Sequence, residues 1–348
     1  MEIIKAKKDN SIELANLAGM AFPGYPFEYV FSKTGVEEAI NNGEQRYTLQ
    51  DDTGQIIGSA VLGLDDTPMA EVKRVMVHPD YRSNGVASKL TQHLCRIANE
   101  NNKLPYAEVR ADQIGMQKAA LSAGMTAISV EPGKHVVYTH DQLGPAREGM
   151  TFMTTGKVSL DDLKKSLRNV PKTIRQRLAV NMDSSLVTTP KDNHLVQTEL
   201  VSPSDSKRLV LNKLLDINAG GPNLKIVGDD IAIWQENGLK VAFILPDRSA
   251  FVSIADINKI NHSLIENSGI QIATIYVNMT DYLSTSRLGH LKYEPTSVRL
   301  WNSTGHNSEW QIGWQARYNN FGNCLHTINL DPTIKEQITK TIDVVNNN

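Results

Sequence analysis

The run from Glu71 to Ala98 constrains the fold of this chain more than any other part of the sequence. It opens with valines at Val72, Val75 and Val77, which suit a pleated strand. A proline then ends the strand, because proline has no N–H to give to a β-ladder. A polar turn with Gly85 follows, and apolar residues recur at helical spacing after it. These apolar residues are Val86, Leu90, Leu94, Ile97 and Ala98. The run therefore predicts an α/β unit of strand, turn and helix, with the helix packed on a sheet.

The turn between this strand and helix has the chemistry of an anion-binding loop. The first N–H groups of a helix have no partner within the helix, and together with the helix dipole they attract phosphate. Gly85 has no side chain, so a diphosphate can approach the backbone closely, and Arg82 adds a positive charge. A plainer interpretation is an ordinary connection that contains one glycine. On these physical grounds alone both interpretations stay open.

The sequence of this turn resembles the signature of a known family. Arg82-Ser83-Asn84-Gly85-Val86-Ala87 matches R/Q-x-x-G-x-G/A, which is typical of the GNAT family of acyl-CoA-dependent N-acyltransferases. The resemblance covers residues 1–140 and is fainter over 225–320. It implies a mixed central sheet with flanking helices, acetyl-CoA or another acyl-CoA as co-substrate, and no metal. It also implies that the diphosphate lies on Arg82, Ser83, Asn84, Gly85, Val86, Ala87 and Ser88.

The resemblance implies where the proton of the acceptor amine goes. Acyl transfer from a thioester needs a neutral amine, and a carboxylate can accept the ammonium proton directly or through water. Glu71 stands eleven residues before Arg82, which is the spacing of the general base in the histone-acetylating branch of the family. The alternative is a carboxylate that merely faces solvent at the start of a strand.

The thioester oxygen and the leaving thiolate need donors of their own. By resemblance, backbone N–H groups of Val75, Met76 and Val77 hold the oxygen where their strand diverges from its neighbour. Gln113 stands where the family often has a cofactor-binding asparagine. Many family members protonate the thiolate with a tyrosine four residues before a helix-ending glycine, but here that position is Ala120. Tyr138, Tyr106, a residue of the second half and water remain as alternative acids.

Composition and charge exclude several classes of protein. The net charge is −2 and the isoelectric point is about 6.5, so no basic surface for nucleic acid or an anionic membrane is expected. No apolar run approaches the roughly 18 residues of a membrane span, and the N-terminus lacks the apolar core of a signal peptide. The two cysteines, Cys95 and Cys324, do not have the spacing of a metal site. We therefore expect a cytoplasmic protein without a metal.

The other elements of the first half follow the order of the same family. Strands are predicted at 3–6, 45–50, 56–62, 107–111, 135–138 and 150–154, and helices at 10–21 and 113–123. Asn10 and Glu13 have the spacing of a capping box, and Gly124 is a helix terminator. The aromatic segment 22–31 has two interpretations. It either packs a second helix into the core or forms a wall of the acceptor site.

The second half predicts a weaker copy of the same pattern. Helices follow Ser159 and cover 205–217, after which strands are predicted at 231–235, 239–245, 250–254, 270–277, 296–301 and 310–318, with helices at 256–267 and 281–288. The turn at 254–257 has no glycine, and Asp256 would repel a diphosphate. We predict a degenerate GNAT-like domain that does not bind CoA. The alternative is a generic α/β domain.

These patterns together predict two domains and an enzyme. Residues 1–150 form the acyl-CoA-binding catalytic domain, 151–224 a helical and irregular connector, and 225–348 the degenerate domain, which either shapes the acceptor pocket or mediates a homodimer. The predicted function is transfer of an acyl group, most simply acetyl, from acyl-CoA to a primary amine by direct attack. The alternative is a non-catalytic acyl-CoA-binding sensor. The acceptor is open between a small amine, an amino acid, an aminosugar and a peptide end.

Overall fold

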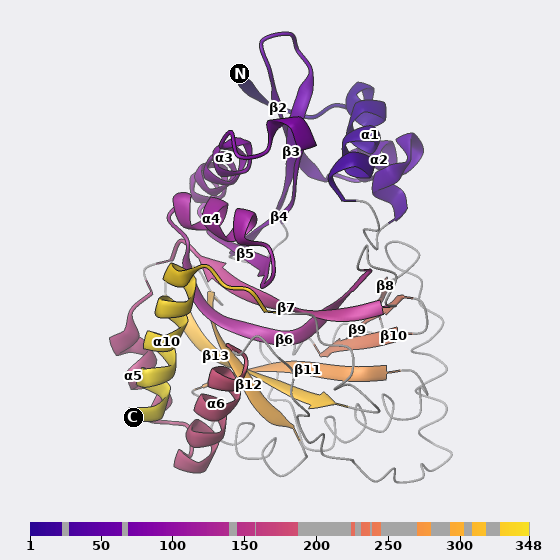
Figure 1. Cartoon of the computed structure of the whole chain (residues 1–348). Coiled ribbons are helices and arrows are strands. Elements are labelled where there is room, and N and C mark those ends of the chain that lie inside the picture. The colour runs from indigo at the N-terminus through magenta and orange to yellow at the C-terminus, as the bar shows by residue number, and fades with distance from the viewer. Residues whose placement is uncertain are drawn as a thin grey trace, which may run out of the picture.

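The structure, a computed structural model, describes most of the first half of the chain and separate parts of the second half. The described residues are 1–22, 28–64, 69–138, 145–156, 158–186, 224–226, 231–236, 239–244, 270–279, 293–302, 308–317 and 328–347. They form two β-sheets with helices packed around them (Figure 1). The predicted strand at 250–254, the turn at 254–257 and the predicted helices at 205–217, 256–267 and 281–288 lie outside the described residues.

The first sheet has seven strands in the order β1-β2-β3-β4-β5-β7-β6. The strands are β1 (Glu2–Lys5), β2 (Gln45–Gln50), β3 (Ile56–Gly63), β4 (Met69–Val77), β5 (Leu104–Arg110), β6 (Thr126–Tyr138) and β7 (Pro145–Thr154). All neighbours are antiparallel except β4 and β5, which are parallel and are connected through α3 (Val86–Glu100). This is the mixed sheet with flanking helices that the sequence predicts.

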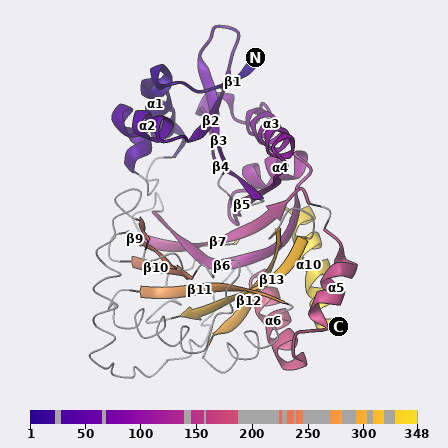
Figure 2. The same cartoon turned by 180° about the vertical axis from the view of Figure 1, so that it is seen from behind.

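Helices cover both faces of the N-terminal part of this sheet (Figures 1 and 2). On one face, α3 and α4 (Ile114–Ser122) pack on β3, β4 and β5. On the other face, α1 (Ser11–Ala21), α2 (Lys33–Asn41) and the short 3₁₀ helix η2 (Glu28–Phe31) form a smaller core that includes Met76 of β4. Two further 3₁₀ turns are η1 (Lys8–Asn10) and η3 (Pro79–Tyr81). The strand β4 is therefore held between two apolar layers.

The second sheet has six strands in the order β12-β13-β11-β10-β9-β8. They are β8 (Leu224–Ile226), β9 (Ile231–Glu236), β10 (Leu239–Ile244), β11 (Ile270–Asn278), β12 (Glu294–Asn302) and β13 (Ser308–Arg317). Of the described strands in this sheet, only β10 and β11 are parallel to each other. The second sheet, taken from β8 to β12, repeats part of the first sheet. Its strand order and the relative directions of its strands are those of β2, β3, β4, β5, β7 and β6. The two sheets meet where β12 packs on β6, and there the Ser129 hydroxyl donates to the Val298 carbonyl.

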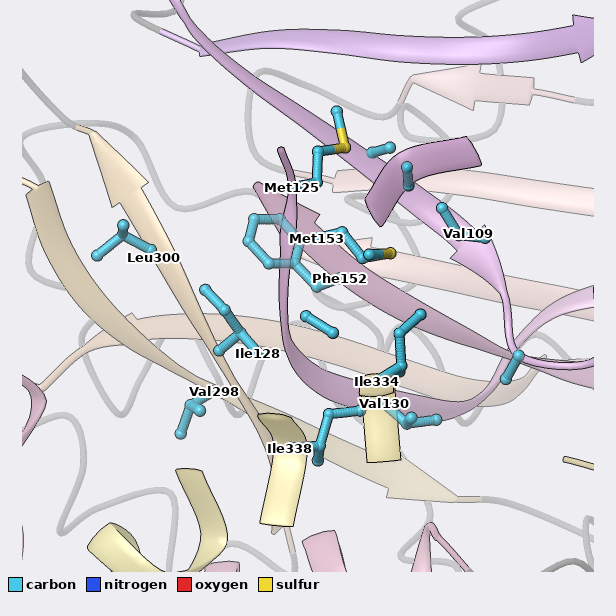
Figure 3. Close-up of a cluster of buried hydrophobic side chains, with 14 of the residues drawn as sticks. Val109, Met125, Ile128, Val130, Phe152, Met153, Val298, Leu300, Ile334 and Ile338 are labelled. Carbon is cyan, nitrogen blue, oxygen red and sulfur yellow. The ribbon is translucent and has the colours of Figure 1, made fainter. Parts of the chain in front are cut away.

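The two halves share one apolar core, which three further helices complete. These are α5 (Leu160–Leu167), α6 (Lys172–Ser184) and α10 (Pro332–Asn347). Figure 3 shows side chains of the first sheet beside Val298 and Leu300 of β12 and Ile334 and Ile338 of α10. The C-terminal segment is also fixed by hydrogen bonds to the first half. The buried Gln117 side chain donates to the Asn329 carbonyl at 2.9 Å and accepts from the Asp331 N–H at 2.6 Å.

Several boundaries differ from the sequence prediction. The strand β6 is much longer than 135–138, because it continues across the second sheet, and β7 begins at Pro145, before the predicted 150–154. The helix α10 was not predicted. The capping box of Asn10 is wrong, because its side chain accepts from the Lys7 N–H at 2.9 Å and caps η1 instead of α1. The cap at Ser159 is confirmed, since its hydroxyl accepts from the Asp162 N–H at 3.2 Å.

The thiol of Cys95 is expected to resist alkylation in the folded protein. Cys95 lies on the apolar face of α3 with 4% exposure, and burial raises its pKa to about 11. Iodoacetamide at pH 8 should leave the Cys95 peptide unmodified in native protein and modify it in urea, as read by peptide mass spectrometry. Equal modification under both conditions would contradict this placement of α3.

Candidate active site

The parallel strands β4 and β5 part from each other near the middle of the first sheet. They pair only from Met69 with Leu104 to Glu71 with Tyr106. Beyond that point β4 stays paired with β3 up to Val77, and β5 stays paired with β7. The two strands thus remain in the sheet through their outer neighbours while their facing edges separate. We refer to the unpaired parts, 72–77 of β4 and 107–110 of β5, as the splay.

A bulge in β4 lies within the splay. Ser59 and Val61 of β3 face Met76 and Lys73 of β4, so β4 contains one extra residue there. Arg74 in this bulge has a φ of 51°, a left-handed conformation that is uncommon for a residue with a side chain. Residues that are held in such sparsely populated backbone conformations cluster at active sites and ligand-binding sites.

The bulge precedes backbone donors that face the splay. The His78 N–H donates to the Ile57 carbonyl of β3 at 2.9 Å. Because N–H groups alternate between the two edges of a strand, those of Val77 and Val75 point toward β5. The strand β5 does not pair with them there. This stretch can therefore supply hydrogen-bond donors to a group that enters between the strands.

The loop that follows β4 is shaped to present backbone N–H groups. Ser83 and Gly85 both have left-handed φ values, 66° and 74°. The first hydrogen bond of α3 runs from the Lys89 N–H to the Gly85 carbonyl at 2.9 Å, and no side chain caps the helix. The N–H groups of the first turn therefore stay available for an anion. The Arg82 side chain is exposed and reaches the Ala21 carbonyl at 3.4 Å.

Glu71 lies at the vertex of the splay, on the face of the sheet that α1 and α2 cover. Its carboxylate accepts from the Lys73 ammonium at 2.7 Å, and the side chain is 27% exposed. Gly63 of β3 leaves room for this pair, because a Cβ there would lie 3.3 Å from the Lys73 Nζ. The position thus places a carboxylate, paired with an ammonium, at the point where the two strands separate.

A family model described as the acetyltransferase (GNAT) family matches residues 13–125. This segment, about a third of the chain, resembles the GNAT acetyltransferases in sequence. It contains β4, the loop and α3, which carry the splay and the left-handed turn. No curated protein matches the chain.

Three solved structures that are similar to part of the chain carry the names of acetyltransferases. The ribosomal-protein-S18-alanine N-acetyltransferase from Escherichia coli is 17% identical with a TM-score of 0.37, and the match covers 45% of this chain and 96% of that one. The phosphinothricin acetyltransferase from Sinorhizobium meliloti, in complex with acetyl-CoA, is 13% identical with a TM-score of 0.37, over 44% and 86%. An N-acetyltransferase from Staphylococcus aureus Mu50 is 19% identical with a TM-score of 0.35, over 44% and 96%.

The other residues that the sequence analysis considered for the site lie at α4, in β5 and in β6. Gln113 precedes α4, just beyond the carboxyl end of β5, with its backbone N–H bonded to the Arg110 carbonyl. Ala120 is fully buried in α4, so this helix face points into the core. Tyr106 pairs in register with Glu71 and stacks on Phe152. Tyr138 belongs to β6, and its side chain lies outside the described residues.

A cluster of charged residues beside the splay was missed by the sequence analysis. Glu44 accepts from the Arg46 Nε at 2.7 Å through Oε1 and from the Arg74 Nη1 through Oε2. The Tyr29 hydroxyl lies 3.4 Å from the same Oε2, and Arg74 lies over the Tyr29 ring at 5.3 Å. We name these four residues the arginine cluster. One feature of the sequence indicates this cluster: Arg46 stands in the predicted strand 45–50, at a position that faces the core.

Opposing effects act on the Glu44 carboxyl. Burial favours its neutral form, but the charges of Arg46 and Arg74 and their hydrogen bonds outweigh burial, so the pKa of Glu44 lies below its ordinary value. The group is therefore an anion at neutral pH. Because Tyr29 lies in η2, the cluster links the aromatic segment 22–31 to β4. The described aromatic side chains of this segment, Phe22, Tyr29 and Phe31, pack on the smaller core, as the core-packing interpretation expects.

Among the described residues, no three histidine, cysteine, aspartate or glutamate side chains come together in a way that would hold a metal ion. Within that part of the chain, every helix is too short or too polar to cross a membrane.

Proposed function

We propose that this protein transfers an acetyl group from acetyl-CoA to a primary amine by direct attack of the amine on the thioester. The observation that carries the proposal is the splay of β4 and β5 next to the left-handed turn of Ser83 and Gly85. The turn presents N–H groups for a diphosphate, and the splay presents edge donors for an extended pantetheine arm. Both belong to the segment that matches the GNAT family.

The chain's own residues account for most of the reaction. Glu71 accepts a proton from the acceptor ammonium, directly or through water, and the neutral amine then attacks the thioester carbonyl carbon. N–H groups of the Val75 to Val77 stretch stabilise the oxygen as negative charge develops on it. The nitrogen of the tetrahedral intermediate loses its second proton to water. When the intermediate collapses, the C–S bond breaks, the amide forms, and the thiolate takes a proton from water. The products are the N-acetylated amine and free CoA.

The proton for the thiolate comes from water in this proposal. Ala120 stands where the family often has the acidic tyrosine, and it is fully buried. A CoA thiolate is already a good leaving group, because thiols are more acidic than water or alcohols. The reaction therefore does not require a dedicated side-chain acid.

We also propose that only the first half of the chain binds acyl-CoA. The second sheet repeats the strand order of the first, but its parallel pair is closed. β10 pairs with β11 from Lys240 to Ile244, the last residue of β10. No splay is therefore open along β10 to admit a pantetheine arm. In this proposal the first unit ends after β7 at Thr154 and the second begins with β8. The helix α10 then packs on β6 of the first unit.

Thiol release tests the proposed activity directly. Purified protein with acetyl-CoA and a panel of amines should release free CoA at a rate that depends on the amine, as read with a thiol reagent, and mass spectrometry should show the acetylated amine. Binding of acetyl-CoA without amine-dependent release would instead support the sensor alternative. Absence of binding would contradict both.

A further inference from the structure

The turn between β5 and α4 is anchored by a distant part of the chain. It covers residues 110–113, begins at the β5 edge of the splay and ends at Gln113, which precedes α4. The Ala111 N–H donates to the Gly149 carbonyl of β7 at 2.8 Å, and the Ala111 carbonyl accepts from the Asn329 N–H at 2.8 Å. The turn is therefore held between β7 and segment 328–331, which leads into α10.

Gln117 of α4 joins the turn to segment 328–331 a second time. Its side-chain amide group donates to the Arg110 carbonyl at 3.3 Å and to the Asn329 carbonyl at 2.9 Å. Its side-chain oxygen accepts from the Asp331 N–H at 2.6 Å. The Gln117 side chain is fully buried, so water does not compete for these three hydrogen bonds. One side chain thus fixes the end of β5 and segment 328–331 to each other.

Gln117 is also one helical turn away from the predicted cofactor contact. Its backbone N–H donates to the Gln113 carbonyl at 3.1 Å. The Gln113 N–H in turn shares the Arg110 carbonyl with the Gln117 side chain. A displacement of Gln117 therefore shifts Gln113 and the end of β5 together. The end of β5 is one edge of the splay, where the pantetheine arm enters in the proposed function.

We propose that Gln117 is a positioning residue for acyl-CoA and that segment 328–331 supports the same site. Gln117 touches no substrate, but it holds Gln113 and the β5 edge of the splay in the arrangement that admits the pantetheine arm. Binding of acyl-CoA and docking of segment 328–331 then favour each other, because two events that stabilise one conformation are linked in both directions. This inference rests on the proposed function and gives the C-terminal segment a role in cofactor binding.

Hydrogen exchange of the wild-type protein, read by mass spectrometry, tests this coupling. Saturating acetyl-CoA should slow exchange at the start of α3 and in a peptide that contains the N–H groups of Asn329 and Asp331. Exchange in α6, which takes no part in these hydrogen bonds, reports the general stabilisation by a bound ligand. We expect the 329–331 peptide to be slowed at least about threefold more than α6, because coupling between two sites commonly amounts to severalfold or more.

The variant Gln117→Leu tests the positioning role, and Gln337→Leu is its matched control. Gln337→Leu breaks a 2.8 Å hydrogen bond from the Ala127 N–H to the Gln337 side chain, so it loosens α10 from β6 and leaves the turn in place. Both variants should lose thermal stability. Only Gln117→Leu should raise the Kd of acetyl-CoA in calorimetric titration, by about tenfold. A merely structural role would lower the fraction of folded protein, and hence the number of sites, without a change in Kd.

Each other outcome overturns a definite statement. If acetyl-CoA protects the start of α3 but slows the 329–331 peptide no more than α6, the positioning role is wrong and acetyl-CoA binding stands. The same holds if Gln117→Leu binds with the wild-type Kd, or if both variants weaken binding alike. If Gln117→Leu does not fold, the exchange of the wild-type protein decides. If the wild type does not bind acetyl-CoA, the proposed function fails and this inference falls with it.

Discussion

Acetyl-CoA should bind wild-type protein at one site per chain in calorimetric titration, and Gly85→Glu should weaken that binding by about 100-fold or more. Gly85 opens α3 with a φ of 74°, and a Cβ there meets no atom within 4 Å. The glutamate side chain therefore projects into open space at the helix start, where it repels a diphosphate and covers its N–H donors. Losing one or two charge-assisted hydrogen bonds costs about 3 kcal/mol, which corresponds to roughly 100-fold in affinity.

Gly124→Glu is the matched control for this experiment. Gly124 has a φ of 80° and open space around a Cβ, so the new side chain brings the same backbone strain of about 1–2 kcal/mol. It lies at the end of α4 instead of the start of α3. Both variants should lose similar thermal stability, but only Gly85→Glu should lose acetyl-CoA. Equal affinities in the two variants would show that the turn is not the diphosphate site.

The stoichiometry of the same titration tests the second sheet. One site per chain is expected, because β10 and β11 stay paired to the end of β10 while β4 and β5 pair over only three positions. Two sites would show that strand pairing does not decide where pantetheine enters. The repeat of strand order would then mean two working copies instead of one.

The first half could be predicted closely because its signals are local. The valines of β4, the glycine of the turn and the apolar spacing of α3 each act within a few residues, and β2 and α3 appear where the sequence predicts them. Gly124 ends α4 with a positive φ for the same reason. The family signature extended these local signals to the order of the whole sheet.

What could not be predicted depends on contacts between distant residues. The length of β6 follows from its packing on β12, and the segment that leads into α10 is held by Gln117, more than 200 residues earlier. The bulge at Arg74 is a shift in the register between β3 and β4, and no single residue specifies such a shift. The Glu44 and Arg74 contact joins residues 30 apart that have no shared pattern. Only Pro332 and the isoleucine spacing after it were local enough to have indicated α10.

Glu71→Gln should lower kcat/KM at neutral pH by about 100-fold or more, with the affinity for acetyl-CoA unchanged. General-base catalysis by a positioned carboxylate typically contributes at least this factor. Glutamine keeps the size of the side chain and cannot accept the ammonium proton. As the pH rises, a larger fraction of the acceptor amine is already neutral, so the deficit of the variant should shrink. A purely structural role of Glu71 would give a loss that does not depend on pH in this way.

Lys73→Met distinguishes the base from the ion pair. It breaks the same 2.7 Å contact from the other side and leaves the Glu71 carboxylate in place. Because the pair is partly exposed, its loss should cost no more than about 1 kcal/mol of stability and little activity. If Lys73→Met and Glu71→Gln lose the same activity, the ion pair is what matters and Glu71 is not the base. If only Glu71→Gln loses activity and regains it with rising pH, the carboxylate at the vertex of the splay takes the proton of the acceptor.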